Sequence, residues 1–498
     1  MARDHRDHPL LDHRRHLCRG LARIVHRRLH ANQRCRIEGL AVSESILVHG
    51  VGVAGAATVK ALVQRGYEVV ASDDAPTAAK RKAMATLGVE FVEAPDARRL
   101  VTLIDSVDSV APAPGVPETH EVVRLAMSRR KAVYGELDLA YEWEQSRPGG
   151  PRPMVAVTGT DGKTTTVTMV EAMINTSGRR AVACGNTDIP LVEALDMDVD
   201  VFVVEATSFR LAFVETFRAQ SSAWLNLAAD HLDWHTSMGS YEAAKARIWR
   251  NVRQSDVAVG VISDPVVARH LDSLRCRRIE IGSPSSSYRV RDGVLECPAG
   301  EIVATSRMRR ALPHDVSNAL VASALCIEPG LAAVTDVAMA LETYEAPHHR
   351  IEFVAESNGV RWFDDSKATT PHAALTAIAG FDRVVLIAGG RNKGLDLADL
   401  AAGIDRIKAV VAIGESADEI EKAFADRRTV LRATSMEEAV AHAASLSSSG
   451  DAVLLSPACA SFDWYGGYQE RGEDFARCVR ARVGGVASKK SKKSGAGK

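Results

Sequence analysis

Two glycine-rich loops each follow a short apolar run and precede a helical pattern, and they constrain the fold more than any other feature. The first loop is residues 50–55, after the apolar run 46–48, and the second is residues 159–162, after the run 154–157. Loops of this kind join a strand to a helix in parallel α/β folds, and their backbone amides can approach a phosphate closely. The chain is therefore predicted to have an α/β fold in which each loop is a candidate site for a phosphate.

The same alternation of strands and helices fills three successive stretches of the 498 residues. A Pro/Gly cluster at residues 146–153 separates the first two stretches, and the third begins near Pro347. Three α/β units in sequence fit parallel or mixed sheets with right-handed crossovers. The predicted divisions are a disordered basic extension at 1–41, a Rossmann-like domain at 42–148, a central P-loop-type ATPase domain with a mostly parallel sheet at 149–346, a C-terminal Rossmann-like domain at 347–486 and a disordered basic tail at 487–498.

The first 40 residues carry ten Arg and six His against four acidic residues, and they show no apolar periodicity. Such a segment cannot bury enough apolar surface to offset the entropy of ordering it. A start codon assigned too far upstream, with Val42 as the true first residue, is the favoured explanation, while a basic arm and a transit-like peptide stay open. The last ten residues hold five Lys and are expected to be disordered too.

The composition argues against several classes of protein. No uninterrupted apolar run of about 18 residues is present, so membrane insertion is not expected. The eight Cys are scattered without a CxxC pair, which argues against a zinc ribbon or a disulfide framework and fits the reducing cytoplasm. The basic ends of the chain alone are a weak signal for nucleic-acid binding, which is not expected. The sequence leaves the oligomeric state open, with a monomer as the expectation.

Gly50, Gly52 and Gly55 form the dinucleotide-binding pattern, and Asp73 stands 18 residues after Gly55, where a carboxylate can bind a ribose. Taken alone, this pattern favours an NAD-dependent oxidoreductase. The diphosphate of a UDP-sugar meets the same requirements, and tight packing of the strand against the helix is a third explanation. The first loop does not choose among these three.

Residues 155–165 have the sequence V-A-V-T-G-T-D-G-K-T-T. This is typical of a phosphate-binding loop in which Lys163 reaches the β- and γ-phosphates and the Thr164 hydroxyl is placed for Mg²⁺. Val157 stands where the usual first glycine would be, so the loop is a shorter variant. A chance glycine turn is the alternative, and the strand before the loop and the helix after it argue against chance.

The sequence T-G-T-x-G-K-T-T resembles the ATP loop of the Mur ligases and of the related folylpolyglutamate synthetases. The resemblance runs from about Val42 to Val483. It implies an enzyme that uses ATP to phosphorylate a carboxylate, after which an amine attacks the acyl phosphate. The residues that it implies for ATP binding are Gly159, Thr160, Asp161, Gly162, Lys163, Thr164, Thr165, Thr166, Asn318, Arg350, Asp365 and Lys367.

The resemblance also implies a magnesium site made by a carboxylate, a histidine and a carbamylated lysine, at Glu205, His231 and Lys245. With Lys163 these residues form the implied catalytic set, and with Thr164 they form the implied ligands of two Mg²⁺ ions. A carbamate turns a cation into an anionic oxygen ligand, which Mg²⁺ prefers. Each residue also has a structural alternative. Glu205 could cap a helix, His231 could be a hydrogen-bonded core histidine, and Lys245 could be a lysine that faces solvent.

Within the family, the C-terminal segments 364–371, 389–394 and 456–472 resemble the member that adds D-glutamate to UDP-N-acetylmuramoyl-L-alanine. An amino acid with two carboxylates needs a cation and hydroxyl donors. The residues implied for D-glutamate are Thr369, Lys393, Ser461 and Tyr468. The residues implied for the UDP-substrate are Gly52, Val53, Ala54, Asp73, Asp74, Gly115, Asn186, Ser208 and Arg210.

Several positions depart from the family pattern. Thr187 and Asp188 stand where the family usually has an apolar residue and a glycine, and Arg210 stands where it usually has glutamine. Asp161 and Asp315 each replace a usual asparagine. Two of these changes add negative charge close to phosphate, which should weaken nucleotide binding unless Mg²⁺ or Arg210 compensates. The competing interpretations are another Mur ligase with a different amino acid, an NAD-dependent oxidoreductase, and an inactive nucleotide-binding protein. Retention of the implied catalytic set argues against the last.

Overall fold

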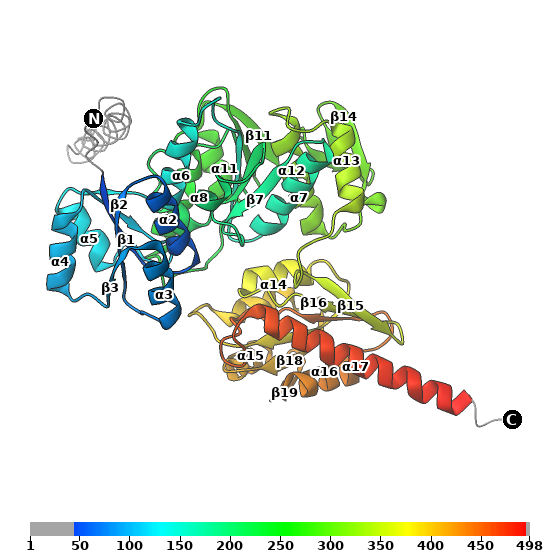
Figure 1. Ribbon diagram of the computed structural model, residues 1–498. Helices are drawn as coiled ribbons and strands as arrows, with labels where there is room; N and C mark the ends of the chain where they lie inside the picture. The colour runs from blue at the N-terminus through cyan, green and yellow to red at the C-terminus, as the bar shows by residue number, and fades with distance from the viewer. Residues whose placement is uncertain (1–43, 495–498) are drawn as a thin grey trace, which may run out of the picture. The chain divides into compact units, whose positions relative to one another are not determined.

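The computed structural model describes residues 44–494, in which strands and helices alternate along the chain (Figure 1). The extension predicted at 1–41 lies outside the described residues. The chain divides into two compact units. The first comprises the described residues up to Ala156 with Arg180–Ser222 and Glu242–Asp256, and the second comprises Val157–Arg179, Ala223–Tyr241 and the described residues from Val257 onward.

The first unit contains a five-stranded parallel sheet with the order β3-β2-β1-β4-β5. Its strands are β1 (Ser45–His49), β2 (Glu68–Asp73), β3 (Glu90–Glu93), β4 (Ser109–Pro112) and β5 (Ala132–Val133). The helices that follow them are α2 (Val53–Gln64), α3 (Ala78–Leu87), α4 (Ala97–Ser106), α5 (Glu121–Ser128) and α6 (Glu136–Gln145). The strand order reverses between β1 and β4, and such a switch point opens a crevice at the carboxyl ends of the strands.

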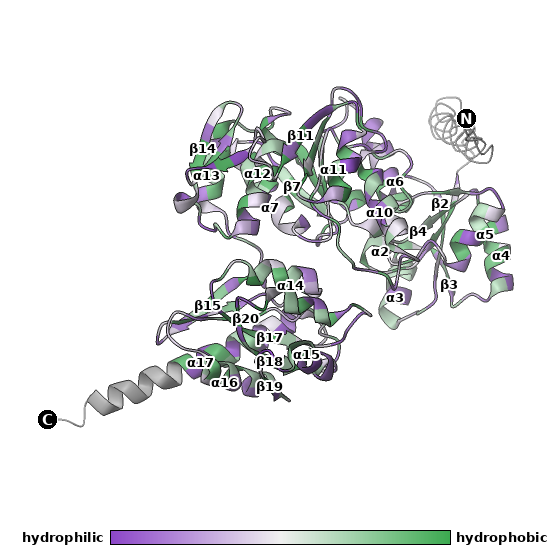
Figure 2. Cartoon of the chain, turned by 180° about the vertical axis from the view of Figure 1, so that it is seen from behind, coloured by the Kyte–Doolittle hydropathy of each residue, from purple (hydrophilic) through white to green (hydrophobic). Residues whose placement is uncertain are grey.

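Helix α4 shows why these segments fold as they do. The side chain of Asp96 caps the helix by accepting a hydrogen bond from the amide of Arg99 at 2.8 Å. Leu100, Leu103 and Ile104 then recur at helical spacing and are buried. Most of the remaining positions are hydrophilic, and both kinds of residue are visible along α4 and α5 in Figure 2. Burial of one apolar face thus holds each helix on the sheet.

Six strands form the second sheet, in the order β11-β10-β9-β6-β8-β7. They are β6 (Met154–Thr158), β7 (Ala181–Gly185), β8 (Val201–Glu205), β9 (Ser221–Trp224), β10 (Val257–Val261) and β11 (Arg277–Ile281). Every residue of β6 is buried, as is typical of a central strand in a parallel sheet. The associated helices are α7 (Lys163–Thr176), α8 (Leu191–Ala194), α9 (Ser208–Leu211), α10 (Met238–Ala246), α11 (Pro265–Asp272), α12 (Pro313–Ile327) and α13 (Val334–Thr343). Strands β12 (Arg289–Arg291), β13 (Val294–Cys297) and β14 (Gly300–Ala304) make a small antiparallel sheet between α11 and α12.

A third large sheet lies wholly in the second unit and has six strands in the order β15-β16-β20-β17-β18-β19. Its strands are β15 (Glu352–Ser357), β16 (Val360–Asp364), β17 (Val384–Gly389), β18 (Ile407–Ile413), β19 (Thr429–Ala433) and β20 (Ala452–Leu455). Strands β15 and β16 form an antiparallel hairpin with a register shift between Phe353 and Ala355, and the other neighbours are parallel. The hairpin therefore adds one antiparallel edge strand to a parallel sheet.

Helices cover both faces of this C-terminal sheet (Figure 1). They are α14 (Pro371–Ile378), η3 (Leu397–Gly403), α15 (Ala417–Phe424), α16 (Met436–Leu446) and α17 (Tyr468–Ser494). Leu386 of β17 packs in one apolar cluster with α14, η3 and α15, and its neighbour Ile387 packs in another with α16 and α17. The alternation of side chains along the strand therefore divides the core into two layers.

The α/β class with mostly parallel sheets, predicted from the sequence, is confirmed. One prediction differs at the C-terminal end, because α17 continues to Ser494 where disorder was expected from residue 487. Residues 486–494 contain neither Gly nor Pro, and four of them are Lys, which is compatible with a helix. In the described part of the chain, no helix combines the length and the apolar character that crossing a membrane requires.

Gly55, in the first turn of α2, leaves no room for a side chain. A Cβ at Gly55 would lie 1.8 Å from the carbonyl oxygen of Gly50. We therefore expect Gly55→Ala to destabilise the protein by about 1–3 kcal/mol, as is typical of overpacking, in urea unfolding. Gly52→Ala is the matched control, since no atom lies within 4 Å of a Cβ there. A Gly55→Ala variant as stable as Gly52→Ala would contradict this packing.

Candidate active site

A pocket of about 730 Å³ lies in the first unit, at the switch point between β1 and β4. The loops after β1, β2 and β4 form much of its wall, and the segment after β7 contributes the rest with α9. Eight of the nine residues implied for the UDP-substrate line the pocket: Gly52, Val53, Ala54, Asp73, Asp74, Gly115, Asn186 and Arg210. The exception is Ser208, which is buried at the start of α9.

Both carboxylate oxygens of Asp73 are engaged within the protein. Oδ2 accepts a hydrogen bond from the amide of Val51 at 2.6 Å, Oδ1 accepts one from Ala75 at 2.8 Å, and Lys80 Nζ lies 2.8 Å from each oxygen. Burial alone would raise the pKa of Asp73, but Lys80 and the two amides outweigh burial, so the pKa is lowered. Asp73 therefore shapes the loop that faces the pocket, and the more exposed carboxylate is that of Asp74.

Asp74 forms a cluster with two histidines in the same pocket. His120 Nε2 lies 2.9 Å from Asp74 Oδ2, and the rings of His49 and His120 are 4.7 Å apart. The Nδ1 of His120 accepts a hydrogen bond from the amide of Val122, so the neutral ring carries its proton on Nε2, which donates to Asp74. A metal ion would require that nitrogen without its proton. The cluster therefore suits hydrogen bonding better than metal binding.

Arg210 is buried and forms an ion pair with Glu136 at the start of α6. Glu136 Oε1 also lies 3.3 Å from the amide nitrogen of Val192, which donates to it. A buried arginine needs such a partner, because an unpaired charge in the interior is costly. The charge of Arg210 is therefore balanced by Glu136 rather than by a carboxylate of the nucleotide loop.

The nucleotide loop, residues 159–162, lies in the second unit between β6 and α7. Gly162 has a φ of +82°, and a Cβ there would lie 2.9 Å from Asn318 Oδ1, so the position requires glycine. Lys163 Nζ donates to the carbonyl oxygens of Gly159 at 2.9 Å and Thr160 at 2.6 Å. These bonds hold the ammonium group over the loop, where it can meet a phosphate.

Asn226 fixes the backbone of this loop. Its Oδ1 accepts hydrogen bonds from the amides of Thr160 at 2.8 Å and Asp161 at 2.9 Å, and its Nδ2 donates to the carbonyl oxygen of Asp161 at 3.3 Å. Asn226 follows β9, which is the neighbour of β6 in the sheet. The sequence pattern places Asn226 after an apolar run but assigns it no role, and only the fold brings it to the loop.

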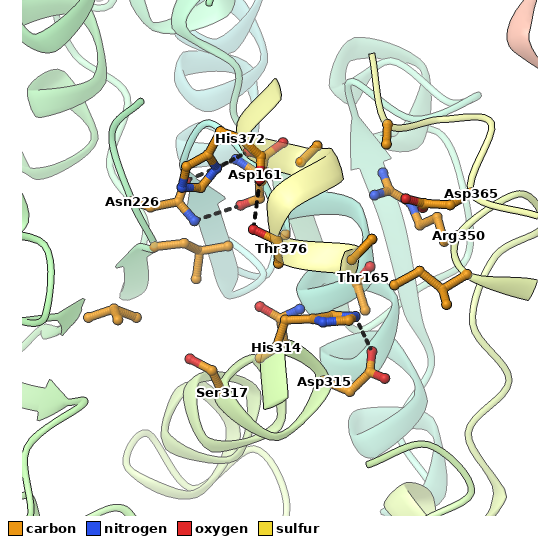
Figure 3. A pocket seen from close by; sticks show the side chains of 18 of the residues that line it. Asp161, Thr165, Asn226, His314, Asp315, Ser317, Arg350, Asp365, His372 and Thr376 are labelled. Atoms are coloured by element: carbon orange, nitrogen blue, oxygen red, sulfur yellow. Dashed lines mark hydrogen bonds and ion pairs between the residues drawn. The ribbon is translucent and has the colours of Figure 1, made fainter. Parts of the chain in front are cut away.

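A cavity of about 450 Å³ adjoins the loop (Figure 3). Seven of the twelve residues implied for ATP line it: Asp161, Gly162, Thr165, Asn318, Arg350, Asp365 and Lys367. The other five lie on the loop and in the first turn of α7: Gly159, Thr160, Lys163, Thr164 and Thr166. A concave site of this size with convergent polar groups suits a nucleotide.

Asp365 is the most strongly perturbed carboxyl group in this cavity. Burial raises its pKa to about 7, although a hydrogen bond from Ser456 Oγ at 2.7 Å and the charge of Arg350 both oppose the shift. The neighbouring carboxylate of Asp364 raises the pKa of Asp365 further. Asp365 can therefore either donate or accept a hydrogen bond near neutral pH, which suits contact with a ribose hydroxyl.

Two carboxylates that depart from the family pattern have cationic partners at this cavity. Asp161 Oδ2 lies 2.5 Å from Nδ1 of His372, the second residue of α14. Asp315 is fully buried and pairs with Arg310 Nε at 3.1 Å. His372 and Arg310 both line the cavity, but the sequence predicts neither as a site residue. Spacing along the chain carries no signal of the contact between Asp161 and His372, which are 211 residues apart.

The segment that enters the C-terminal sheet has an unusual backbone. His349 and Ile351 have positive φ angles of 64° and 49°, which cost a residue with a side chain about 1 kcal/mol or more. His349 Nδ1 lies 2.7 Å from Asp364 Oδ2, and this hydrogen bond raises the pKa of His349. Arg350 stands between the two strained residues and lines the cavity. The bond to Asp364 thus helps to hold Arg350 in place.

Glu205 and Lys245, two of the implied magnesium ligands, belong to the first unit and are 2% and 1% exposed. Glu205 ends β8 and accepts a hydrogen bond from Asn186 Nδ2 at 3.0 Å. Lys245 lies on α10. Its burial contradicts the alternative of a solvent-facing lysine and favours a specific role, because lysine is almost never fully buried without a partner.

Thr164 and His231, the other two implied ligands, belong to the second unit. His231 has a φ of +55°, and its Nε2 lies 3.1 Å from Asp230 Oδ2, so the ring is held in one orientation. Its side chain is 30% exposed, which contradicts the alternative of a core histidine. A single magnesium site built from all four residues stays a prediction.

Two of the four residues implied for D-glutamate adjoin each other, since Lys393 Nζ lies 3.4 Å from Thr369 Oγ1. Ser461 is buried before α17. Tyr468 begins α17, and its ring lies 5.0 Å from Lys367 Nζ. The described contacts therefore join Tyr468 to a residue implied for ATP, and they place a cation beside a hydroxyl at Lys393 and Thr369.

Comparison with known proteins agrees with this arrangement of loops and pockets. Residues 157–326 match the Mur ligase middle domain, and residues 349–459 match the Mur ligase, glutamate ligase domain. The UDP-N-acetylmuramoylalanine--D-glutamate ligase of Frankia casuarinae is 40% identical over 453 residues, which cover 88% of this chain and 94% of the relative. The protein of the same name from Mycolicibacterium vanbaalenii is 37% identical, with 88% and 98% covered. The chain therefore belongs to the Mur ligase family.

Solved structures share the fold at low sequence identity. The pseudomurein peptide ligase type C from Methanothermus fervidus has a TM-score of 0.55 at 18% identity, covering 87% of this chain and 100% of that chain. The MurF ligase from Thermotoga maritima in complex with ADP has a TM-score of 0.56 at 14% identity, with 89% and 96% covered. The family and the fold together leave the NAD-dependent oxidoreductase unsupported.

The hydrogen bond between His349 and Asp364 should make stability depend on pH. Because it raises the pKa of His349 above 6.5, its stabilisation is fully present below 6.5 and is lost as pH rises through the folded pKa. We expect His349→Gln to lower the urea midpoint more at pH 6 than at pH 9. His348→Gln is the control, since this ring is 85% exposed and should show a much smaller difference. Equal effects of His349→Gln at both pH values would exclude this role.

Proposed function

We propose that this protein joins D-glutamate to UDP-N-acetylmuramoyl-L-alanine with cleavage of ATP to ADP and phosphate, in peptidoglycan precursor synthesis. The observation that carries the proposal is the similarity of 88% of the chain to ligases that bear this name. The nucleotide loop and its cavity supply the ATP site that the reaction needs. Another Mur ligase with a different amino acid is the alternative.

The UDP-substrate is assigned to the pocket at the switch point of the first unit. Its diphosphate would meet the backbone amides at the start of α2, where the helix N-terminus favours an anion. Asp74, Asn186 and Gly115 line the same pocket and supply polar contacts. We propose the domain division 42–148 for the UDP-substrate, 149–346 for ATP and 347–486 for D-glutamate.

The reaction has two steps. A carboxylate oxygen of the alanyl group attacks the γ-phosphorus of ATP, and the bond from this phosphorus to the bridging oxygen of the β-phosphate breaks. ADP departs, and the alanyl carboxylate is now an acyl phosphate. Lys163 offsets the negative charge that develops on the transferred phosphoryl group. The amine of D-glutamate then attacks the acyl carbon and loses a proton, and inorganic phosphate leaves as the amide forms.

Mur ligases use Mg²⁺ with ATP, and the bound ion neutralises charge on the phosphate oxygens. The burial of Glu205 and Lys245 fits this requirement, because a buried carboxylate or carbamate needs a cation nearby. We infer that Lys245 carries a carbamate and that it serves two Mg²⁺ ions together with Glu205, Thr164 and His231. His231 would offer a nitrogen whose ring is oriented by Asp230.

D-glutamate is assigned to the group around Lys393. The ammonium group can pair with a side-chain carboxylate, and the adjacent Thr369 hydroxyl can donate to it. Ser461 and Tyr468 complete the proposed set. The substrates are small molecules and the reaction is proposed for the cytoplasm, with no nucleic-acid partner. The expected monomer stays a prediction.

The function is tested by phosphate release from ATP with UDP-N-acetylmuramoyl-L-alanine and one of D-glutamate, L-glutamate, L-alanine or diaminopimelate. We expect turnover with D-glutamate and release at least about tenfold slower with the others, since each of them lacks or misplaces at least one charged contact worth roughly 1.5–3 kcal/mol. Lys163→Ala is the inactive control. Preference for another amino acid would indicate a Mur ligase with a different substrate. Absence of phosphate release with all four amino acids would reject the proposed ligase activity.

The carbamate at Lys245 is tested by substitution and rescue. Lys245→Ala removes the anionic oxygen ligand, so turnover should be lost, and added formate or acetate should restore part of it. Lys60→Ala on α2 is the matched control, because Lys60 is exposed. Circular dichroism and the urea midpoint report whether the variant is folded. Full activity of folded Lys245→Ala would disprove the carbamate.

A further inference from the structure

A histidine and an aspartate connect α14 to the nucleotide loop within the second unit (Figure 3). His372 Nδ1 lies 2.5 Å from Asp161 Oδ2, and Asp161 stands immediately before Gly162. Both residues line the cavity assigned to ATP. The pair therefore joins the loop proposed for the phosphates to the first turn of α14. The segment just before α14 contains residues of the ATP and D-glutamate sets.

Asp161 places a negative charge where a triphosphate would bind, and like charges repel strongly in a partly buried site. Burial would raise the pKa of Asp161, but His372, Lys163 and Arg350 outweigh burial and lower it. The hydrogen bond to Asp161 raises the pKa of His372 in turn. The two groups thus favour an imidazolium and a carboxylate, whose charges cancel before a nucleotide binds.

The carboxylate of Asp161 is not what holds the loop in shape. Asn226 binds the amide of Asp161 at 2.9 Å and its carbonyl oxygen at 3.3 Å, and it also binds the amide of Thr160 at 2.8 Å. All of these contacts use backbone groups of the loop. The side chain of Asp161 therefore adds a charge that must be balanced, rather than a bond on which the backbone of the loop depends.

His372 also differs from a packing residue. Its side chain is 43% exposed, whereas Ala374 and Ala377 of the same helix are 0% and 1% exposed and belong to the apolar core. Truncation of His372 would leave no large internal cavity. The contribution of His372 is therefore electrostatic and directional, and it is separable from the packing of α14.

We propose that His372 is a positioning residue of the nucleotide site, which balances Asp161 and holds the first turn of α14 against the loop. The inference rests on the proposed ATP-dependent function. The position of α14 also affects Lys367 and Thr369, because they stand just before this helix, whose N-cap is Thr370. A loss of the pair would shift residues implied for both ATP and D-glutamate.

Four proteins test the proposal: wild type, His372→Ala, Asp161→Asn and the double variant. ATP binding is measured by calorimetry with Mg²⁺ and without the UDP-substrate, and the KM for ATP and kcat are measured in the full reaction. We expect His372→Ala to weaken ATP binding about tenfold or more, because Asp161 is left unbalanced. Asp161→Asn and the double variant both lack the unbalanced charge, so both should bind ATP at least about threefold more tightly than His372→Ala, and the double variant should stay weaker than Asp161→Asn because the pair is lost.

A double variant as weak as His372→Ala would show a role independent of Asp161 and overturn the proposal, and unchanged binding in His372→Ala would do the same. His442→Ala on α16 is the matched control, since this histidine is also partly exposed and should leave ATP binding unaltered. Because ATP binding is measured without turnover, a failed ligase assay rejects the proposed function separately. Absence of ATP binding by the wild type would overturn both.

Discussion

The two hydrogen bonds that Asn226 Oδ1 accepts fix the backbone of the nucleotide loop, on which the space assigned to ATP depends. They come from a residue that follows the neighbouring strand β9, so the loop takes its shape from the sheet rather than from itself. Gly162 can then turn with a positive φ and approach Asn318, which lines the cavity from α12. The loop, the sheet and α12 are thereby fitted to one another around the space assigned to ATP.

The sequence predicted the α/β class and both ligand loops, because these depend on local patterns of glycine, apolar runs and helix caps. Most of the residues that the resemblance to the Mur ligases implied for ATP and for the UDP-substrate line the two pockets. Asp73 and Tyr468 mark the limit of such patterns. Spacing cannot tell whether a carboxylate faces a ligand or its own turn, and it cannot tell which site a tyrosine at the start of a helix will join.

The partners of the unusual charged residues could not be predicted from the sequence. Three of the charged departures from the family pattern are matched by an opposite charge in the fold: Asp161 by His372, Asp315 by Arg310 and Arg210 by Glu136. His372 and Glu136 come from elements far along the chain from their partners, and one chain without its fold carries no record of which segments meet, whereas Arg310 stands only five residues before Asp315. The sequence led us to expect that the added carboxylates weaken nucleotide binding. That expectation did not take into account the cationic side chains that neutralise Asp161 and Asp315 in the fold.

The antiparallel hairpin of the C-terminal sheet bears on how the protein behaves at high concentration. An edge strand can template pairing with another chain and so begin aggregation. Strand β15 lies at such an edge and carries the side chain of Phe353, which is 55% exposed. The register shift beside Phe353 interrupts the regular ladder, and Glu352 and Glu356 add negative charge along the strand. The hairpin thus gives a parallel sheet an edge that resists fibril-like growth.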